Sequence, residues 1–159
     1  MVTTVVFIVL ALVLFLLSFT IDKWYNNDNV STYKFQKWEK VDLPYITVDV
    51  GGHPLNAITD SAASVSLVRR ESLAGLPYER NGRQVNLVAV TDDTINSETV
   101  IIPIVVNGKE IKTDFAIYDG DDIGNFKRFG VNIDILLGVE FFKASNGIIN
   151  FENQTVTFP

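Results

Sequence analysis

The sequence contains no cysteine, and this absence excludes several kinds of site at once. A disulfide framework, a zinc–thiolate centre and a cysteine nucleophile all require thiol groups. Histidine is almost as scarce, because His53 is the only one in the chain. A catalytic triad or a histidine metal site would need supporting ligands, and the residues around His53 do not supply them. We therefore expect His53 to be a surface turn residue, and we expect no metal centre and no cofactor.

Basic residues are also fewer than acidic residues. The chain carries 13 lysine and arginine residues against 19 aspartate and glutamate residues, which gives a net charge of −6. No basic stripe interleaves with aromatic residues, as it would in a surface that binds phosphate backbones and bases. Nucleic acid is therefore excluded as the expected partner.

Charge of either sign is missing from the start of the chain, where the 20 residues from Val2 to Ile21 are rich in Val, Leu, Ile and Phe. As a helix with a rise of 1.5 Å per residue, they would span roughly 30 Å, the thickness of the hydrocarbon core of a bilayer. A cleavable signal peptide is the alternative, but its basic start and small-residue cleavage site are absent. The sequence predicts an uncleaved transmembrane helix over residues 1–21, with Trp24 and Tyr25 at the membrane interface.

Lysines follow the apolar stretch, whereas only the terminal amine precedes it. The rule that positive flanks stay inside then favours a single-pass membrane protein with a cytoplasmic domain after the helix. The lysines concerned are Lys23, Lys34, Lys37 and Lys40.

Residues 22–43 are polar and show no sustained period, which predicts a juxtamembrane linker. The alternation of Tyr33, Phe35 and Trp38 leaves a short strand as the alternative. Residues 44–159 then form one domain, which is long enough for a single core.

The sequence of this domain is typical of β-structure. Residues 45–50 and 55–59 flank Gly51-Gly52, and residues 101–106 and 111–118 flank Asn107-Gly108, so two hairpins are expected. Further strands are expected within 65–68 and 84–100, with a helical turn near 69–73, a short helix at 141–143 and a final hairpin over 148–158. We predict a mainly β fold, a small closed barrel with one short helix.

Two motifs follow these elements. The first is Asp60-Ser61-Ala62-Ala63-Ser64, directly after an apolar strand, and the second is Ile135-Leu136-Leu137-Gly138. A carboxylate on a tight loop after a buried strand indicates acid–base chemistry on a rigid support. Two such carboxylates about 3 Å apart cannot both ionise, so they share one proton and can activate water for peptide hydrolysis without a metal.

Together the motifs resemble those of retropepsin-like aspartic proteases, which carry Asp-Thr/Ser-Gly-Ala-Ser/Thr, then a flap hairpin, then two hydrophobic residues and glycine. The resemblance covers about Tyr45 to Phe158, and makes 44–159 the protease domain. It implies that Asp60 is catalytic and that Ser61 braces the loop across a dimer. The other loop-supporting positions that it implies are Ala62, Ala63, Ser64, Leu136, Leu137 and Gly138.

Only one such loop is present, so the resemblance implies an active homodimer that cleaves polypeptides and receives one Asp60 from each subunit. Its flap, expected to cover the substrate, spans Ala89 to Asn96. The flap residues implied to contact substrate are Ala89, Val90, Thr91, Asp92, Asp93, Thr94 and Ile95. Asp134 is the nearest candidate in the chain for a second carboxylate, but no hydroxyl and small-residue loop follows it.

Two departures from the family pattern bear on activity. Ala62 stands where the family has glycine, and the flap lacks the usual glycines. A membrane-anchored aspartic endopeptidase is the function we expect. A catalytically impaired protease-fold module that binds or scaffolds peptides is the alternative, and a structural β-domain in which Asp60 only caps a loop is a third possibility.

Charged residues elsewhere are expected to face solvent. We interpret Arg69 and Arg70 as surface charges, and residues 119–122, Asp-Gly-Asp-Asp, as a solvated acidic turn without the ligand pattern of a calcium loop.

Overall fold

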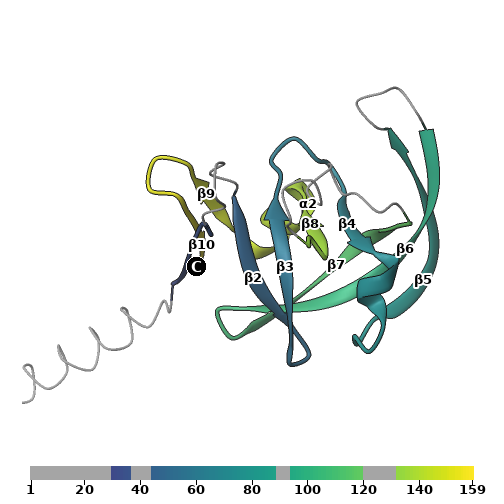
Figure 1. Cartoon of the computed structure of the whole chain (residues 1–159), viewed down its shortest axis with the longest axis horizontal. Coiled ribbons are helices and arrows are strands. Elements are labelled where there is room, and N and C mark those ends of the chain that lie inside the picture. Colours follow the sequence, from purple (N-terminus) through teal and green to yellow (C-terminus); the bar gives the residue numbers. More distant parts are fainter. Residues whose placement is uncertain (1–29, 37–43, 89–93, 120–131) are drawn as a thin grey trace, which may run out of the picture.

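The computed structural model of the chain describes residues 30–36, 44–88, 94–119 and 132–159 (Figure 1). Its elements are β1 (Ser31–Lys34), β2 (Tyr45–Val50), β3 (His53–Thr59), β4 (Ser66–Arg69), the 3-10 turn η1 (Arg70–Leu73), β5 (Glu79–Val88), β6 (Thr94–Val106), β7 (Lys109–Tyr118), β8 (Ile135–Leu137), α2 (Val139–Ser145), β9 (Ile148–Asn150) and β10 (Thr155–Phe158). The expected mainly β fold with one short helix is confirmed.

The predicted membrane helix over residues 1–21 lies outside the described residues, as do residues 22–29 and 37–43 of the predicted linker. Within the described ranges, no helix is long and apolar enough to cross a membrane.

Part of the predicted linker is a strand. β1 pairs antiparallel with β10, in a register that sets Ser31 opposite Phe158 and Lys34 opposite Thr155. The ring of Tyr33 meets the ring of Phe158 edge-on, with centroids 5.7 Å apart. The interpretation of residues 31–34 as linker is therefore wrong, and the folded unit begins before residue 44. The physical reason is that the alternating aromatic residue Tyr33 finds an apolar partner at the far end of the chain.

Both predicted hairpins are confirmed, and their turn residues explain them. Gly51 and Gly52 have φ angles of 60° and 87°, and Asn107 and Gly108 have φ angles of 52° and 68°. Two successive positive φ angles produce the turn whose twist matches that of antiparallel strands, and glycine and asparagine adopt it most readily. The hairpins β2–β3 and β6–β7 follow from these local preferences.

The larger sheet closes into a barrel. Its strand order is β2-β3-β8-β4-β7-β6-β5, and β2 also pairs with β6, where Asp49 lies opposite Val105. β8 lies between β3 and β4, parallel to β3 and antiparallel to β4. The smaller sheet, in the order β1-β10-β9, lies at one side of the barrel (Figure 1).

The core lies inside this barrel because the strands alternate. In β2, Ile46, Val48 and Val50 point inward and are at most 2 % exposed, whereas the residues between them are less buried. Phe115, Phe141 and Phe158 are fully buried in the same cluster. Burial of each large apolar side chain contributes about 1.5–3 kcal/mol, so this core supplies the rigidity that the loop after β3 requires.

Candidate active site

Asp60 follows β3 directly, and backbone hydrogen bonds of Thr59 and Asp60 fix its position. Thr59, the last residue of β3, is 3 % exposed, and its backbone N–H and Oγ1 donate to the carbonyl of Pro44 over 2.8 and 3.1 Å. The N–H of Asp60 donates to the carbonyl of Leu137 over 3.0 Å. The buried strand therefore ends at Thr59, and Asp60 leaves it half-buried.

The loop after Asp60 is a tight turn closed by that residue. Its Oδ1 accepts the N–H of Ala62 over 2.8 Å, and its carbonyl accepts the N–H of Ala63 over 3.3 Å. Within the described residues, Oδ2 of Asp60 accepts no hydrogen bond. One carboxylate oxygen thus orients the side chain, and the other remains available to water or to a second carboxyl group.

The second motif lies against the first, as the resemblance implied. In β8, Leu136 and Leu137 lie opposite Ile58 and Thr59 of β3, and they are 8 % and 0 % exposed. The N–H of Val139 donates to the carbonyl of Ala63 over 2.8 Å. The two motifs, which are far apart in the sequence, thus form one support for Asp60.

Gly138 makes this close packing possible. A Cβ atom added there would lie 2.8 Å from the carbonyl oxygens of both Ala63 and Val65. The N–H of Gly138 donates to Oγ of Ser66, which is fully buried, over 3.0 Å. Sequence reasoning missed Ser66, although a hydroxyl at the start of a strand, two residues beyond the motif, was the available signal.

The remaining loop residues lie at the surface. Ser61, Ala62 and Ser64 are exposed, and Ala63 is half-buried. Ser61 makes no side-chain hydrogen bond to the described part of its own chain. Ala62 does not adopt a positive φ angle, so the backbone at this position does not require glycine. The Cβ of Ala62 therefore fits the loop of the single chain.

A cleft of about 330 Å³ lies beside this loop and beneath the β5–β6 hairpin. From the loop side it is lined by Ala62, Ala63, Ser64, Val65 and Leu67. From the hairpin it is lined by Asn86, Leu87, Val88 and Ile95, and Tyr118 completes it. None of the described residues that line this cleft is a lysine, arginine, aspartate or glutamate, so this part of the cleft suits apolar side chains.

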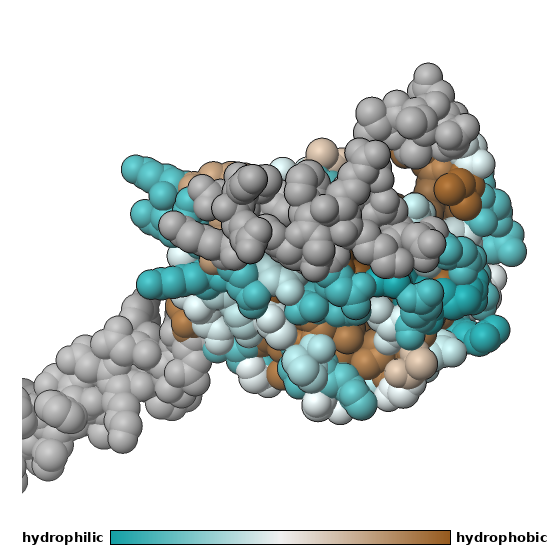
Figure 2. Space-filling model, in the orientation of Figure 1, coloured by the Kyte–Doolittle hydropathy of each residue, from teal (hydrophilic) through white to brown (hydrophobic). Residues whose placement is uncertain are grey.

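The end of the β5–β6 hairpin carries solvent-exposed apolar side chains. Val88 is 69 % exposed and Ile95 is 48 % exposed. Figure 2 shows hydrophobic side chains at this end of the hairpin, with an open space between them and the barrel. Of the predicted flap residues that the structure describes, Thr94 and Ile95 lie in β6; Ile95 lines the cleft and Thr94 does not. Ala89, Val90, Thr91, Asp92 and Asp93 lie outside the described residues.

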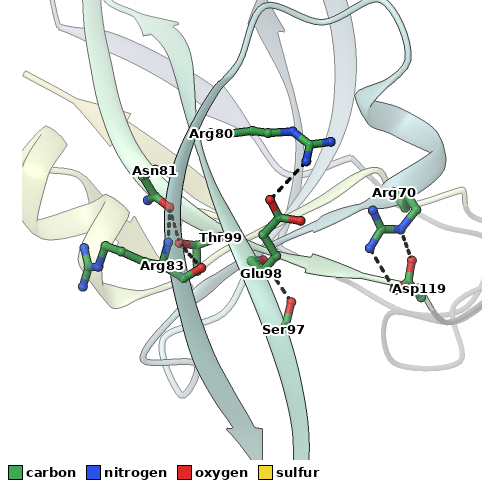
Figure 3. Close-up of polar contacts among 8 residues, drawn as sticks. All are labelled: Arg70, Arg80, Asn81, Arg83, Ser97, Glu98, Thr99 and Asp119. Atoms are coloured by element: carbon green, nitrogen blue, oxygen red, sulfur yellow. Dashed lines mark hydrogen bonds and ion pairs between the residues drawn. The ribbon is translucent and has the colours of Figure 1, made fainter.

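Polar contacts that the sequence did not indicate fix the base of the hairpin (Figure 3). Oδ1 of Asn81 accepts the hydroxyl of Thr99 over 2.8 Å and the N–H of Arg83 over 3.0 Å. Nδ2 of Asn81 donates to Asp114 on β7 over 2.8 Å. These contacts lie where the pairing of β5 with β6 shifts register, so side chains replace part of the interrupted ladder.

Arg70 and Asp119 form an ion pair next to the cleft (Figure 3). The second hydrogen bond of the pair, from Nη2 of Arg70 to Oδ2 of Asp119, measures 3.1 Å. This hydrogen bonding lowers the pKa of Asp119 and raises the pKa of Arg70. With Arg69, Glu71 and Tyr118, the pair lines a pocket of about 260 Å³.

The interpretation of Arg69 as a surface charge is wrong, because the residue is 7 % exposed. Its guanidinium donates to the side chain of Asn132 and forms an ion pair with Glu71. These partners compensate the buried positive charge of Arg69. Without them, burial of this charge would be strongly unfavourable. Arg70 is exposed, as expected.

Asp134 has a structural role. Its Oδ2 accepts the N–H of Asn56 and its Oδ1 accepts the hydroxyl of Ser72, both over 2.8 Å. It precedes β8, whereas Asp60 contacts the opposite end of that strand. Asp134 is therefore not placed to act as a second carboxylate for Asp60.

Two further expectations concern ligands. His53 is exposed at the start of β3, beside the turn. Among the residues that the structure describes, no three His, Cys, Asp or Glu residues gather in a way that could hold a metal ion.

Comparison with solved structures identifies the fold. The retroviral protease-like domain of Ddi1 from Leishmania major aligns with 18 % identity and a TM-score of 0.50, over 75 % of this chain and 90 % of that domain. A retropepsin-like aspartic protease from Rickettsia conorii aligns with 14 % identity and a TM-score of 0.53, over 81 % of this chain and 89 % of that protein. No family model matches the sequence. A search of curated proteins also finds no match. The fold is therefore that of retropepsin-like aspartic protease domains.

Proposed function

We propose that the protein is an aspartic endopeptidase in which Asp60 residues from two copies of the chain activate water. The observation that carries this proposal is the position of Asp60. It lies at the end of a buried strand and donates its N–H to Leu137, and the loop that follows it packs against Gly138 and lines the cleft through Ala62, Ala63 and Ser64. The similarity of the fold to a retroviral protease-like domain and to a retropepsin-like aspartic protease supports the same function.

In this mechanism the two carboxyl groups share one proton. The ionised Asp60 takes a proton from water, and the water oxygen bonds to the carbonyl carbon of the peptide. The protonated Asp60 gives its proton to the carbonyl oxygen, so that a neutral diol forms. The diol collapses as the C–N bond breaks, and a carboxyl group delivers the proton that the leaving amine needs. The Ala62 N–H holds one oxygen of each carboxyl group in place throughout.

The cleft indicates how a peptide would lie. An extended segment fits between the Asp60 loop and the β5–β6 hairpin, with an apolar side chain against Leu67, Leu87 and Ile95. The hairpin then covers the scissile bond from the side opposite Asp60.

Dimer formation and membrane attachment are parts of the same proposal. A lone Asp60 cannot form the pair, so a symmetric homodimer is required. The apolar stretch from Val2 to Ile21 anchors the protein in a membrane, and the lysines that follow place the protease domain on the cytoplasmic side. Confinement to one membrane raises the effective concentration of the two copies and favours pairing.

The decisive experiment is incubation of the protein with a diverse peptide library from acid to neutral pH, beside the Asp60→Asn variant. Asparagine can still accept the Ala62 N–H through its amide oxygen, so the fold is retained while the acid–base function is lost. We expect cleavage to fall by at least about 100-fold.

Asp49→Asn is the matched control, because Asp49 is an exposed aspartate that accepts a backbone N–H, from Gly52, in the β2–β3 turn. It should cleave like the unmodified protein. Full activity in Asp60→Asn, with an unchanged circular dichroism spectrum, would exclude the mechanism.

A peptide-binding module without turnover is the second candidate, favoured by the Cβ of Ala62, which lines the cleft where the family has glycine. The Ala62→Gly variant separates the two functions. A large gain in cleavage would show that this Cβ impairs the natural protein, and peptide binding without cleavage in both forms would favour the binding module.

A further inference from the structure

Two cavities of the structure share one wall residue, Tyr118. The apolar cleft beside the Asp60 loop has a volume of about 330 Å³, and the pocket that contains Arg70 and Asp119 has a volume of about 260 Å³. Tyr118 lines both cavities, and no other residue among those that the structure describes does so. The half-buried side chain of Tyr118 therefore forms a boundary between the cleft and the pocket.

The pairing of β4 with β7 explains this position. Side chains two residues apart in a strand point to the same face and lie about 7 Å apart, so Leu67 in the cleft and Arg69 in the pocket share one face of β4. Tyr118, the last residue of β7, is paired with Arg69. Its ring packs with Leu67 against the small apolar cluster that includes Leu136, which fixes the ring at the border.

The two sides of this boundary differ in charge. The described lining of the cleft holds no charged side chain, whereas the pocket holds Arg69, Arg70, Glu71 and Asp119. The side chains of Glu71 and Asp119 are the most open of the four, at 74 % and 66 % exposed, against 53 % for Arg70 and 8 % for Arg69. Each carboxylate already pairs with an arginine but keeps acceptor sites for a further donor. The pocket thus suits a cationic group, and the described part of the cleft does not.

A lysine side chain in the cleft would meet this boundary. Its apolar stem could lie along the cleft wall, but the ring of Tyr118 would stop its ammonium group before the carboxylates of the pocket. A charge taken out of water without a partner is strongly unfavourable, whereas a leucine side chain carries no such cost. A site that withholds a partner from the wrong ligand gains specificity in this way.

We propose that Tyr118 is a specificity-determining residue, which closes the apolar cleft against the charged pocket. It thereby selects peptides with an uncharged side chain in the cleft over peptides with lysine there. This proposal rests on the proposed function in one respect, because it takes an extended peptide as the occupant of the cleft. It adds the residue that sets the preference and the class of side chain that is rejected.

The first test measures peptide binding to the full-length Asp60→Asn protein in mild detergent, where binding is observed without cleavage. The probes are fluorescein-labelled hexapeptide mixtures in which one position is fixed as leucine or as lysine and the others are varied. Fluorescence anisotropy gives the affinity for lysine relative to leucine at each position. Tyr118→Ala should raise this ratio at one position by about 5-fold or more, the factor typical of an ion pair with partly exposed carboxylates.

Three further variants separate this role from a general loosening of the sheet. Tyr118→Phe keeps the ring and should leave the ratio unchanged. Tyr78→Ala is the matched control, because Tyr78 is a partly exposed tyrosine near Arg70 that lines neither cavity. It should also leave the ratio unchanged. Adding Asp119→Asn to Tyr118→Ala should remove the gain for lysine, whereas a merely loosened sheet would keep it.

A crystal structure of Tyr118→Ala provides a second test that needs no peptide. The cleft and the pocket should merge into one cavity that extends from Leu67 to Asp119. Tyr118→Val, with a side chain suited to the end of a strand, serves both tests if the alanine variant does not fold.

The outcomes are distinct from those for the proposed function. Two separate cavities in the variant, or a lysine-to-leucine ratio that changes no more than in Tyr78→Ala, would overturn the role of Tyr118 even if the protein cleaves peptides. The expected change of the ratio in a protein that cleaves nothing would keep Tyr118 as the residue that selects the bound peptide, and would remove the endopeptidase.

Discussion

At the scale of single residues, Gly138 is the position where the two motifs leave no room for a side chain. Its backbone faces the carbonyl oxygens of Ala63 and Val65, which cannot rotate away. Gly138→Ala should lower the free energy of unfolding by about 1–3 kcal/mol, because the loop must shift to relieve the contact. Urea denaturation measures this change.

Gly52→Ala is the control for this prediction. Gly52 has a φ angle of 87° and open space around its Cα, so alanine there adds backbone strain without a collision. It should cost about 1 kcal/mol and leave peptide cleavage intact. Equal losses in both variants, with activity retained in Gly138→Ala, would contradict the role of the close contact.

Asp119 provides a prediction on ionisation. Its hydrogen bond with Arg70 lowers its pKa below 3.8, so the ion pair stabilises the folded state above that pH and its contribution is lost as the pH falls. In the Arg70→Gln variant the pKa of Asp119, followed by carbon-detected NMR, should rise toward 3.8. An unchanged midpoint would show that the ion pair does not persist in solution.

The sequence predicted residues whose role is carried by a local motif. The motif placed Asp60 on a tight loop and Gly138 behind that loop, which the structure also shows, and the catalytic role of Asp60 stays a prediction. Ser66 and Arg69 were missed because their burial depends on strands that approach from elsewhere in the chain. For Ser66 the sequence offered only its place at the start of a strand just beyond the motif, and for Arg69 no local signal separates a buried arginine from a surface charge.

At the scale of elements, the β5–β6 hairpin depends on a side-chain cluster at its base. Asn81→Ala removes the acceptor of the Thr99 hydroxyl and the Arg83 N–H, where the strand ladder is already interrupted. We expect a loss of about 1–2 kcal/mol and faster hydrogen exchange along residues 84–88 and 94–98.

Asn96→Ala is the comparison on the same hairpin. Its amide contacts Asn86 at an exposed position, so its removal should change stability by less than about 0.5 kcal/mol. If the two variants exchange hydrogen equally, the cluster at the base does not hold the hairpin.

Elements with a local turn signal were predictable, and those that need a distant partner were not. Asn107-Gly108 specifies its hairpin because both residues tolerate positive φ angles. β1 has no such signal, since its pairing partner β10 lies at the other end of the chain.

At the scale of the whole molecule, β1 joins the two ends of the folded chain. A chain that starts at Pro44 should be less stable than one that starts at Val30 by about 1–3 kcal/mol, because it loses four cross-strand pairs and the contact of Tyr33 with Phe158. Thermal unfolding of the two chains tests this. Equal stability would restore residue 44 as the start of the domain.

The parallel placement of β8 beside β3 has a consequence for the newly made protein. The support of Asp60 joins residues far apart in the sequence, and the bond from Gly138 to Ser66 spans 72 positions. During synthesis, the loop that carries Asp60 emerges from the ribosome long before the strand that clamps it. Because the amino-terminal part of a chain leaves first, the carboxyl group cannot be fixed until Leu137 and Gly138 have also left the ribosome. Under the proposed function, a chain still under translation therefore has no fixed Asp60 with which to form the catalytic pair.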